Sequence, residues 1–507
     1  MKSIRKKIGD TLGTEKFSAS TMTALAIAVV AVLNVLLYTL VELFGLYLYS
    51  PESDDLTLSG ATDSLFSSAI EDDKKVTVYF CLSEDEVKNH DTGSFVYQTA
   101  KYFEERYPEF IELDYVNIIT RRNKNGEIVS LSKYQTDMQG NETPIFGSSV
   151  IFECGDNYRV VTDTATAAGY SPFFTLNSAG EVTSYNGEEV MAAMISWVTS
   201  SEHRNAYFTQ YHGETADVSF SNLLSCAGYY VDVIDLRKNE VPDDADLLII
   251  SNPTSDFEAA REGSGIRAEI DRVKTYVERG GNIYIELDPY VKTLPVLEGF
   301  LSECGISFSG TENADGKKIR NMIKDARNAI TTDGFTLVTE FSDDELSGRI
   351  SDNVSKYTDG SVMIREASAL ELSKNARPLL VTSPAAVLEA AGETVSSQGP
   401  FCVAAYAEVA TTGAAAAKIF VIPSIYLAVS DSLTSDGYSN KDFIYSLLDE
   451  FFGADNLPYG CKPVLYDTQM LENLTMGTAR LYTALIMLIP AAVAAAGAIV
   501  ITRRKRR

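Results

Sequence analysis

Hydrophobic and polar positions alternate along the chain in blocks that predict membrane helices, strands and amphipathic helices. Two uncharged apolar runs lie near the ends, at Thr21–Val41 and Leu481–Thr502. As α-helices these runs are each about 30 Å long, which matches the hydrocarbon core of a bilayer. We therefore predict one transmembrane helix at each end, with the lipid bilayer as a partner of the chain.

Basic residues flank both apolar runs on the side toward the chain end. Residues 1–20 carry five basic and two acidic side chains, and residues 503–507 are all basic. The positive-inside rule places both ends in the cytoplasm and the intervening segment outside the plasma membrane. A cleaved signal peptide is disfavoured, because the first run exceeds about 15 residues and no A-x-A site follows. A cell-wall sorting signal is also disfavoured, because residues 457–460 (LPYG) lack the threonine of LPxTG.

The pattern after residue 75 predicts a small α/β domain. A strand at Val76–Leu82, a helix at Phe95–Tyr107 and a strand at Phe110–Ile119 form a βαβ unit, which implies a parallel pair. A hairpin at Ser148–Thr162 and a helix at Glu188–Ser200 complete the domain. This order resembles a thioredoxin-like domain, although Cys81 on the first strand has no partner for a redox dithiol.

A second domain begins near residue 203 with repeated β-α-β alternation. The expected strands are 205–208, 229–236, 245–250, 282–287, 378–382, 401–408 and 418–423, and the expected helices are 218–226, 266–279 and 442–452. Glycines terminate the helices, and the alternation predicts a doubly wound parallel sheet. Residues 309–376 are polar and weakly periodic, and are expected to form a partly irregular insertion.

The predicted organisation therefore has eight parts. In order they are the basic N-terminus 1–20, transmembrane helix 21–41, linker 42–75, thioredoxin-like domain 76–202, larger α/β domain 203–455, stalk 456–480, transmembrane helix 481–502 and basic tail 503–507. The fold class is α/β, with a two-domain ectodomain anchored in the membrane at both ends.

Composition and charge exclude several functions. The formal net charge of −27 disfavours nucleic-acid binding, because a phosphate backbone requires a basic face. Six dispersed cysteines and three histidines give neither a disulfide framework nor a zinc pattern. No P-loop, GxGxxG or GxSxG motif occurs, so we predict no cofactor, no metal and no catalytic activity.

Three loops follow predicted strands of the second domain. They are His212-Gly213-Glu214, Ser251-Asn252-Pro253 and Asp288-Pro289. Ligands of open α/β sheets bind outside the carboxyl ends of the strands, so these are the candidate ligand or partner loops. His212 beside Glu214 could serve as an acid–base or metal pair, but one histidine and one carboxylate are too few for either role.

The three loops belong to longer motifs, Tyr207–Glu214 (YFTQYHGE), Asp243–Pro253 (DDADLLIISNP) and Val277–Pro289 (VERGGNIYIELDP). Their order and spacing resemble the auxiliary component of gliding-motility-type ABC transporters, the GldG-like proteins. That family has a GHGE turn, a P-x-D-A-D-x-L-x-I…P strand and a GG-x₆-D-P strand. Tyr211 stands where the turn has its first glycine. The resemblance covers residues 203–290 best, and 70–200 and 375–455 more weakly.

The resemblance implies a glutamine-amidotransferase-like, flavodoxin-like fold without its catalytic residues. It also implies an ABC-2-type permease and a cytoplasmic ABC ATPase as partners. The function expected on these grounds is that of a non-catalytic auxiliary subunit whose ectodomain contacts the permease or its cargo. Two alternatives remain: an extracytoplasmic hydrolase or carbohydrate-binding protein that uses His212, Glu214 and Asp288, and a free-standing surface adhesin.

Overall fold

The structure is a computed structural model that describes residues 58–465, apart from short gaps. The gaps are 91, 163–170, 177–181, 216–217, 260–266, 314–315, 359, 397, 412–414 and 436. All described residues belong to the second of two compact units, Thr57–Arg507. None of their helices is long and apolar enough to cross a membrane. Both predicted transmembrane helices and both basic tails lie outside the described residues.

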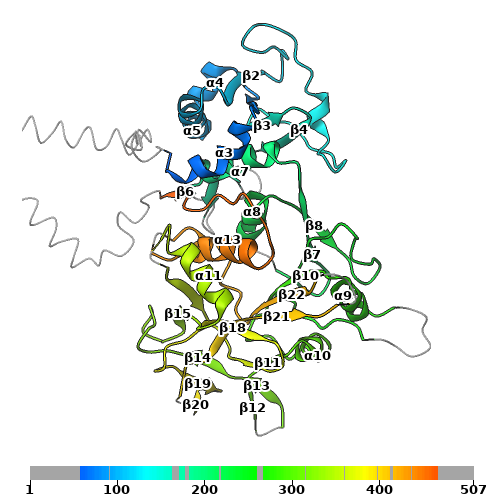
Figure 1. Cartoon of the computed structure of the whole chain (residues 1–507), viewed down its shortest axis with the longest axis vertical. Helices are drawn as coiled ribbons and strands as arrows, with labels where there is room; N and C mark the ends of the chain where they lie inside the picture. Colours follow the sequence, from blue (N-terminus) through cyan, green and yellow to red (C-terminus); the bar gives the residue numbers. More distant parts are fainter. Residues whose placement is uncertain are drawn as a thin grey trace, which may run out of the picture. The chain divides into compact units, whose positions relative to one another are not determined.

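The first part of the described chain contains a mixed four-stranded sheet with order β2-β1-β3-β4; Figure 1 labels its strands β2, β3 and β4. Its elements are α3 Ala61–Glu71, β1 Val76–Phe80, α4 Glu84–Lys88, α5 Gly93–Arg106, β2 Ile111–Tyr115, the 3₁₀ turn η1 Ser132–Gln135, β3 Ser149–Cys154, β4 Asn157–Thr162, β5 Phe174–Leu176, β6 Val182–Tyr185 and α7 Gly187–Thr199. β1 and β2 are parallel, and β3 and β4 form a hairpin. The predicted βαβ unit and hairpin are therefore confirmed.

The second part is built on a sheet of eleven strands. Its first elements are β7 Arg204–Thr209, α8 Val218–Cys226, β8 Tyr229–Ile234, β9 Leu247–Ser251, α9 Glu269–Glu278, β10 Asn282–Glu286 and α10 Pro295–Glu303. With β22 Ala417–Ile422 they give five adjacent parallel strands in the order β8-β7-β9-β10-β22. The predicted α/β class with a parallel sheet is confirmed.

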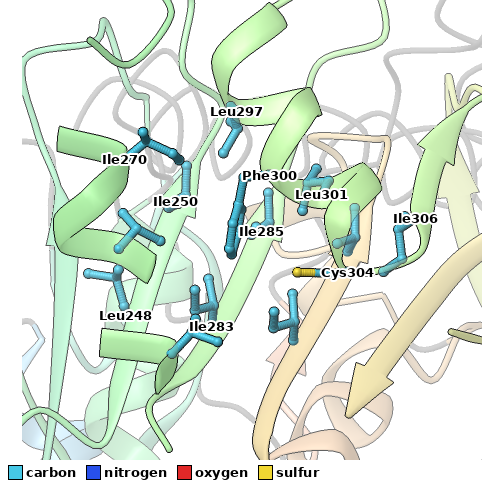
Figure 2. Packing of buried hydrophobic residues seen from close by; sticks show 14 of the residues in the cluster. Leu248, Ile250, Ile270, Ile283, Ile285, Leu297, Phe300, Leu301, Cys304 and Ile306 are labelled. Atoms are coloured by element: carbon cyan, nitrogen blue, oxygen red, sulfur yellow. The ribbon is translucent and has the colours of Figure 1, made fainter. Parts of the chain in front are cut away.

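Helices cover both faces of the parallel strands. On one face, Leu248 and Ile250 of β9 belong to the same continuous core as Leu297 and Phe300 of α10 (Figure 2). On the other face, Phe220 of α8 packs against the ring of Tyr284 at a centroid distance of 4.9 Å. β9 is buried along its whole length, as expected of a strand covered on both faces.

The far side of the sheet corrects two predictions. The remaining elements are β11 Ile306–Phe308, β12 Gly310–Glu312, β13 Lys318–Arg320, β14 Met322–Lys324, β15 Thr336–Phe341, α11 Glu345–Val354, β16 Val362–Arg365, β17 Leu370–Leu372, β18 Arg377–Val381, β19 Val387–Ala390, β20 Glu393–Ser396, β21 Cys402–Val409, α12 Ser430–Leu433, α13 Asn440–Glu450 and β23 Val464–Leu465. β18 and β21 are antiparallel to their neighbours, so the sheet is mixed rather than wholly parallel. The described residues between β18 and β21, and those between β21 and β22, form no helix, whereas a parallel pair needs a long crossover connection, usually a helix.

The segment 309–376, expected to be a partly irregular insertion, contributes regular elements to the large sheet. It supplies β15 and β16 to the edge of the large sheet, and its helix α11 packs against α13. The short strands pair with residues far away in sequence, such as Phe341 with Leu380. Local periodicity cannot reveal such pairing.

The segment 42–75 was predicted to be a linker, but its described end forms helix α3. Phe66 of this helix is fully buried and contacts the rings of Phe103, Tyr107 and Phe110. Burial of one aromatic side chain contributes about 2–3 kcal/mol, which helps to hold α3 on the domain.

Helix α7 joins the two parts of the described chain. Glu189 of this helix accepts hydrogen bonds from Lys441 (3.0 Å) and Tyr445 (2.6 Å) of α13. The Lys441 ammonium and the Glu189 carboxylate are both largely buried. Each charge would destabilise the fold if it were buried alone, and the pairing reduces this cost.

Candidate functional site

The candidate loops emerge from the carboxyl ends of neighbouring parallel strands. His212 follows β7, Asn252 follows β9 and Asp288 follows β10. From β7 the chain passes to β8 on one side, and β9 lies on the other, so the strand order reverses between β7 and β9. This reversal is the point at which open α/β sheets bind ligands.

Direct hydrogen bonds join the loops after β7 and β9. The backbone N–H groups of Thr254 and Ser255 both donate to the carbonyl of His212 at 2.8 Å. The side-chain amide of Asn252 donates to Thr215 Oγ1 at 2.7 Å. The sequence pattern predicts these two loops at one edge, and the structure brings them into contact.

His212 lies between two carboxylates. Its Nδ1 is 2.8 Å from Glu214 Oε1, and its Nε2 is 3.1 Å from Glu269 Oε2. The imidazole stacks on Phe257 with a centroid distance of 4.1 Å and an interplanar angle of 10°. Only 3% of His212 is exposed. The Glu214 carboxylate also accepts the His212 backbone N–H at 2.6 Å, which closes the turn on itself.

The electrostatics favour the charged form of His212. Burial by itself lowers the pKa of His212. The hydrogen bonds to Glu214 and Glu269 raise this pKa by more than burial lowers it, so it lies above its ordinary value. For Glu214, burial raises the pKa and the hydrogen bond from His212 lowers it. The lowering is larger, so the pKa of Glu214 is below its ordinary value. The two carboxylates therefore favour the imidazolium form of His212 over the neutral form.

The backbone of the turn requires glycine at one position. Gly213 has φ +77°, and a Cβ at this position would lie 2.1 Å from Thr254 Oγ1. Tyr211 and Asn252 also have positive φ angles, of 82° and 53°. Such conformations are costly for residues with side chains and persist where the surroundings enforce them.

The remaining predicted residues have structural partners. Ser251 Oγ donates to Glu286 Oε2 at 3.2 Å, and Asp288 Oδ1 accepts the backbone N–H of Tyr290 at 2.8 Å. Pro253 and Pro289 are buried in their turns. No hydrogen bond between described residues joins Asp288 to His212, so the third loop is not part of the histidine cluster.

Sequence reasoning missed Glu269, the second carboxylate on His212. Glu269 is 57 positions away at the first turn of α9, where the helix dipole favours negative charge. Its Oε2 also accepts the backbone N–H of Glu258 at 2.6 Å, while its buried Oε1 has no hydrogen-bond partner. The sequence does contain a sign of this role. Glu269 lies at helical spacing from Val273 and Tyr276, so it is a charged residue on the buried face of α9.

This arrangement restricts the chemistry of the site. Both ring nitrogens of His212 are engaged by carboxylates, so neither is free to move a proton to or from a substrate. Among the described residues, no group of three or more His, Cys, Asp or Glu side chains could hold a metal ion. The cluster fixes the two loops to α9 and leaves their outer surface, including the half-exposed Tyr211, available for contact.

Comparisons with known proteins found similarity only among solved structures. No protein-family profile and no curated protein matches the chain. The N-terminal domain of mmIFT52 aligns with 48% of this chain and 96% of its own length, at 16% identity and a TM-score of 0.35. PurLQS from Thermotoga maritima aligns with 49% of this chain and 99% of its own, at 14% identity and a TM-score of 0.28. A ThuA-like protein from Parabacteroides merdae aligns with 49% and 90%, at 11% identity and a TM-score of 0.28. At these TM-scores the similarities carry no inference about function.

Proposed function

We propose that the chain is a non-catalytic, membrane-anchored auxiliary subunit of an ABC-2-type transporter. Its partners would be the permease and a cytoplasmic ABC ATPase, and its described part would lie outside the plasma membrane. The first sheet would be thioredoxin-like and the second flavodoxin-like, close to the glutamine-amidotransferase arrangement. The motifs at Tyr207–Glu214, Asp243–Pro253 and Val277–Pro289 support the proposal through their resemblance to GldG-like proteins.

One structural observation carries the proposal: both ends of the described chain are held at one corner. Ser59 donates through its backbone N–H and its hydroxyl to Glu188 Oε1, at 2.7 and 2.8 Å. At the other end, Val464 of β23 pairs with Tyr185 of β6. Tyr185 and Glu188 are three positions apart, so these attachment points are at most about 11 Å apart along the backbone. Two ends that lie together can enter one membrane side by side, as the proposed pair of anchors requires of ends on the same side of the domain.

The closed histidine cluster supports the non-catalytic part of the proposal. A hydrolase that used His212, Glu214 and Asp288 would need a free ring nitrogen and a common pocket. In the described structure the nitrogens are engaged, and Asp288 belongs to a separate turn. These contacts count against a hydrolase that uses these three residues.

The surface for a protein partner would be the carboxyl edge of the parallel strands. Tyr211 and Tyr290 are 57% and 63% exposed there, after β7 and β10. The Arg237 guanidinium lies 3.8 Å from the ring centre of Tyr211 and holds it in place. Tyrosine and arginine are enriched in the binding hot spots of protein interfaces.

Purification of the full-length protein from its native cell in mild detergent tests the proposal. We expect a permease and an ATPase to accompany the wild-type chain. Y211S/Y290S should reduce their recovery at unchanged expression, and V395S, at an exposed valine on β20, should not. Recovery of the protein alone, from cells whose other membrane complexes stay intact, would refute the auxiliary-subunit function.

A further inference from the structure

A cavity of about 340 Å³ lies away from the candidate loops, between β4, α7 and α8. Its apolar walls include Val160 and Val161 of β4 and Val190 and Met194 of α7. Thr143, Asn222 and Ser225 add polar groups, and the half-exposed Phe146 also lines it. A space of this size falls in the range of small-molecule sites, which are mostly apolar with a few polar groups.

Arg159 of β4 brings a positive charge to this cavity. The charged centre of its guanidinium lies 4.8 Å from the ring centre of Trp197 and 4.9 Å from that of Tyr230. No ion pair of the described residues includes Arg159; the two aromatic rings flank its guanidinium, and the carboxylate of Asp137 acts on it only from beyond ion-pair distance. Burial lowers the pKa of Arg159 because a buried guanidinium loses its hydration, and the nearby groups, including Tyr230 and Asp137, offset this only in part.

The groups around Arg159 add unused hydrogen-bonding capacity. Trp197 Nε1 and His203 Nδ1 are buried without a hydrogen-bond partner, whereas the hydroxyl of Tyr230 interacts with Arg159. Trp197 is 3% exposed, and the His203 ring stacks on it at 3.8 Å. Burial, followed by the nearby charge of Arg159, lowers the pKa of His203, which keeps this ring neutral at neutral pH. The indole and guanidinium N–H groups are donors only, so an acceptor would satisfy the cluster.

We propose that this cavity binds a small organic carboxylate with an apolar body, whose carboxylate pairs with the guanidinium of Arg159. Arg159 forms no ion pair with a carboxylate of the described residues, so a ligand with one negative charge would balance its charge. A guanidinium and a carboxylate form two parallel hydrogen bonds. The apolar walls accept the rest of the ligand. The site shares no residue with the loops proposed to contact the permease. The ligand-binding proposal can therefore be correct or wrong independently of the proposed transporter function.

The test uses full-length protein in phosphatidylcholine nanodiscs, with empty discs as the blank. Trp197 is the single tryptophan of the chain and its ring centre lies 4.8 Å from the guanidinium of Arg159, so its fluorescence reports on the surroundings of that group. Octanoate should change this fluorescence saturably with one equivalent, whereas the neutral octanamide should bind at least about tenfold more weakly. Equal binding of the two compounds, or no saturable response to octanoate, would overturn the proposal. This comparison needs no variant.

Variants then assign the charge to Arg159. R159M should weaken octanoate binding at least about tenfold without changing the response to octanamide, and R159K should bind with intermediate affinity. R122M removes an exposed arginine of the same domain and should bind as the wild type does. Circular dichroism establishes that each variant is folded. A folded R159M that binds octanoate like wild type would place the anion elsewhere and refute the assignment.

Discussion

Replacement of His212 with glutamine tests whether the cluster at the carboxyl edge is a structural link. The wild-type imidazolium makes charge-assisted hydrogen bonds to Glu214 and Glu269, whose side chains are only 7% and 3% exposed. A glutamine amide can replace one donor at most. Each lost bond to a charged partner costs about 1.5–3 kcal/mol, and a buried carboxylate left unpaired adds to this cost. We expect H212Q to lower the free energy of unfolding by about 3–4 kcal/mol.

Urea unfolding at constant pH and salt measures this change, followed by circular dichroism and by Trp197 fluorescence. E269Q in the H212Q background should recover about 1–2 kcal/mol, because it removes the unpaired buried charge. H90Q changes a histidine on the surface and should cost less than about 1 kcal/mol. A loss below about 1 kcal/mol in H212Q, or no recovery on adding E269Q, would refute the argument that His212 neutralises the carboxylates.

Three further predictions concern pH, backbone and packing. Because the pKa of His212 is raised in the folded protein, its contribution to the free energy of unfolding is complete below about pH 6.5 and is lost as the pH rises through the folded-state pKa. Because the pKa of His203 is lowered, its contribution is complete above about pH 6.5 and is lost as the pH falls through the folded-state pKa. Melting temperatures between pH 5 and 9 should therefore show H212Q flattening the alkaline limb and H203Q the acid limb; unchanged limbs would contradict both. G213A should lower the free energy of unfolding by about 2–3 kcal/mol, and G126A, at a similar φ but with no atom within 4 Å of the added carbon, by only about 1 kcal/mol; equal urea midpoints would contradict the predicted steric contact. F66A should cost about 3–5 kcal/mol and expose α3 to limited proteolysis, and protease resistance equal to wild type would show that α3 is held by other contacts.

The elements of the parallel core could be predicted because their signals are local. The helix at Val218–Cys226 has the predicted bounds, and the buried β9 follows from its continuous apolar run. The edge strands β15 and β16 of the same sheet could not be predicted, because they are stabilised by pairing with each other and with β18, and their own periodicity is weak. Helix α3 was missed because its contribution depends on one residue, Phe66, and on rings 37–44 positions away.

The candidate site likewise contains residues that local sequence spacing predicts and residues that only the fold brings together. His212 and Glu214 were recognised because two positions separate them and a strand precedes them. Glu269 comes from a helix that follows another strand, and only the fold brings its carboxylate to the imidazole. The cluster around Arg159 gave no sequence signal, because its aromatic partners come from α7 and β8 and their spacing matches no motif.

The common attachment of Ser59 and Leu465 also bears on protein engineering. The block of about 400 residues between them leaves and returns to the rest of the chain at neighbouring positions, as inserted domains do in natural proteins. Its two ends could therefore be grafted into a single surface loop of an unrelated carrier protein without forcing that loop open. Such a chimera would present the carboxyl edge and the Arg159 cavity in solution, where ligands and candidate partners could be screened in the absence of lipid and detergent.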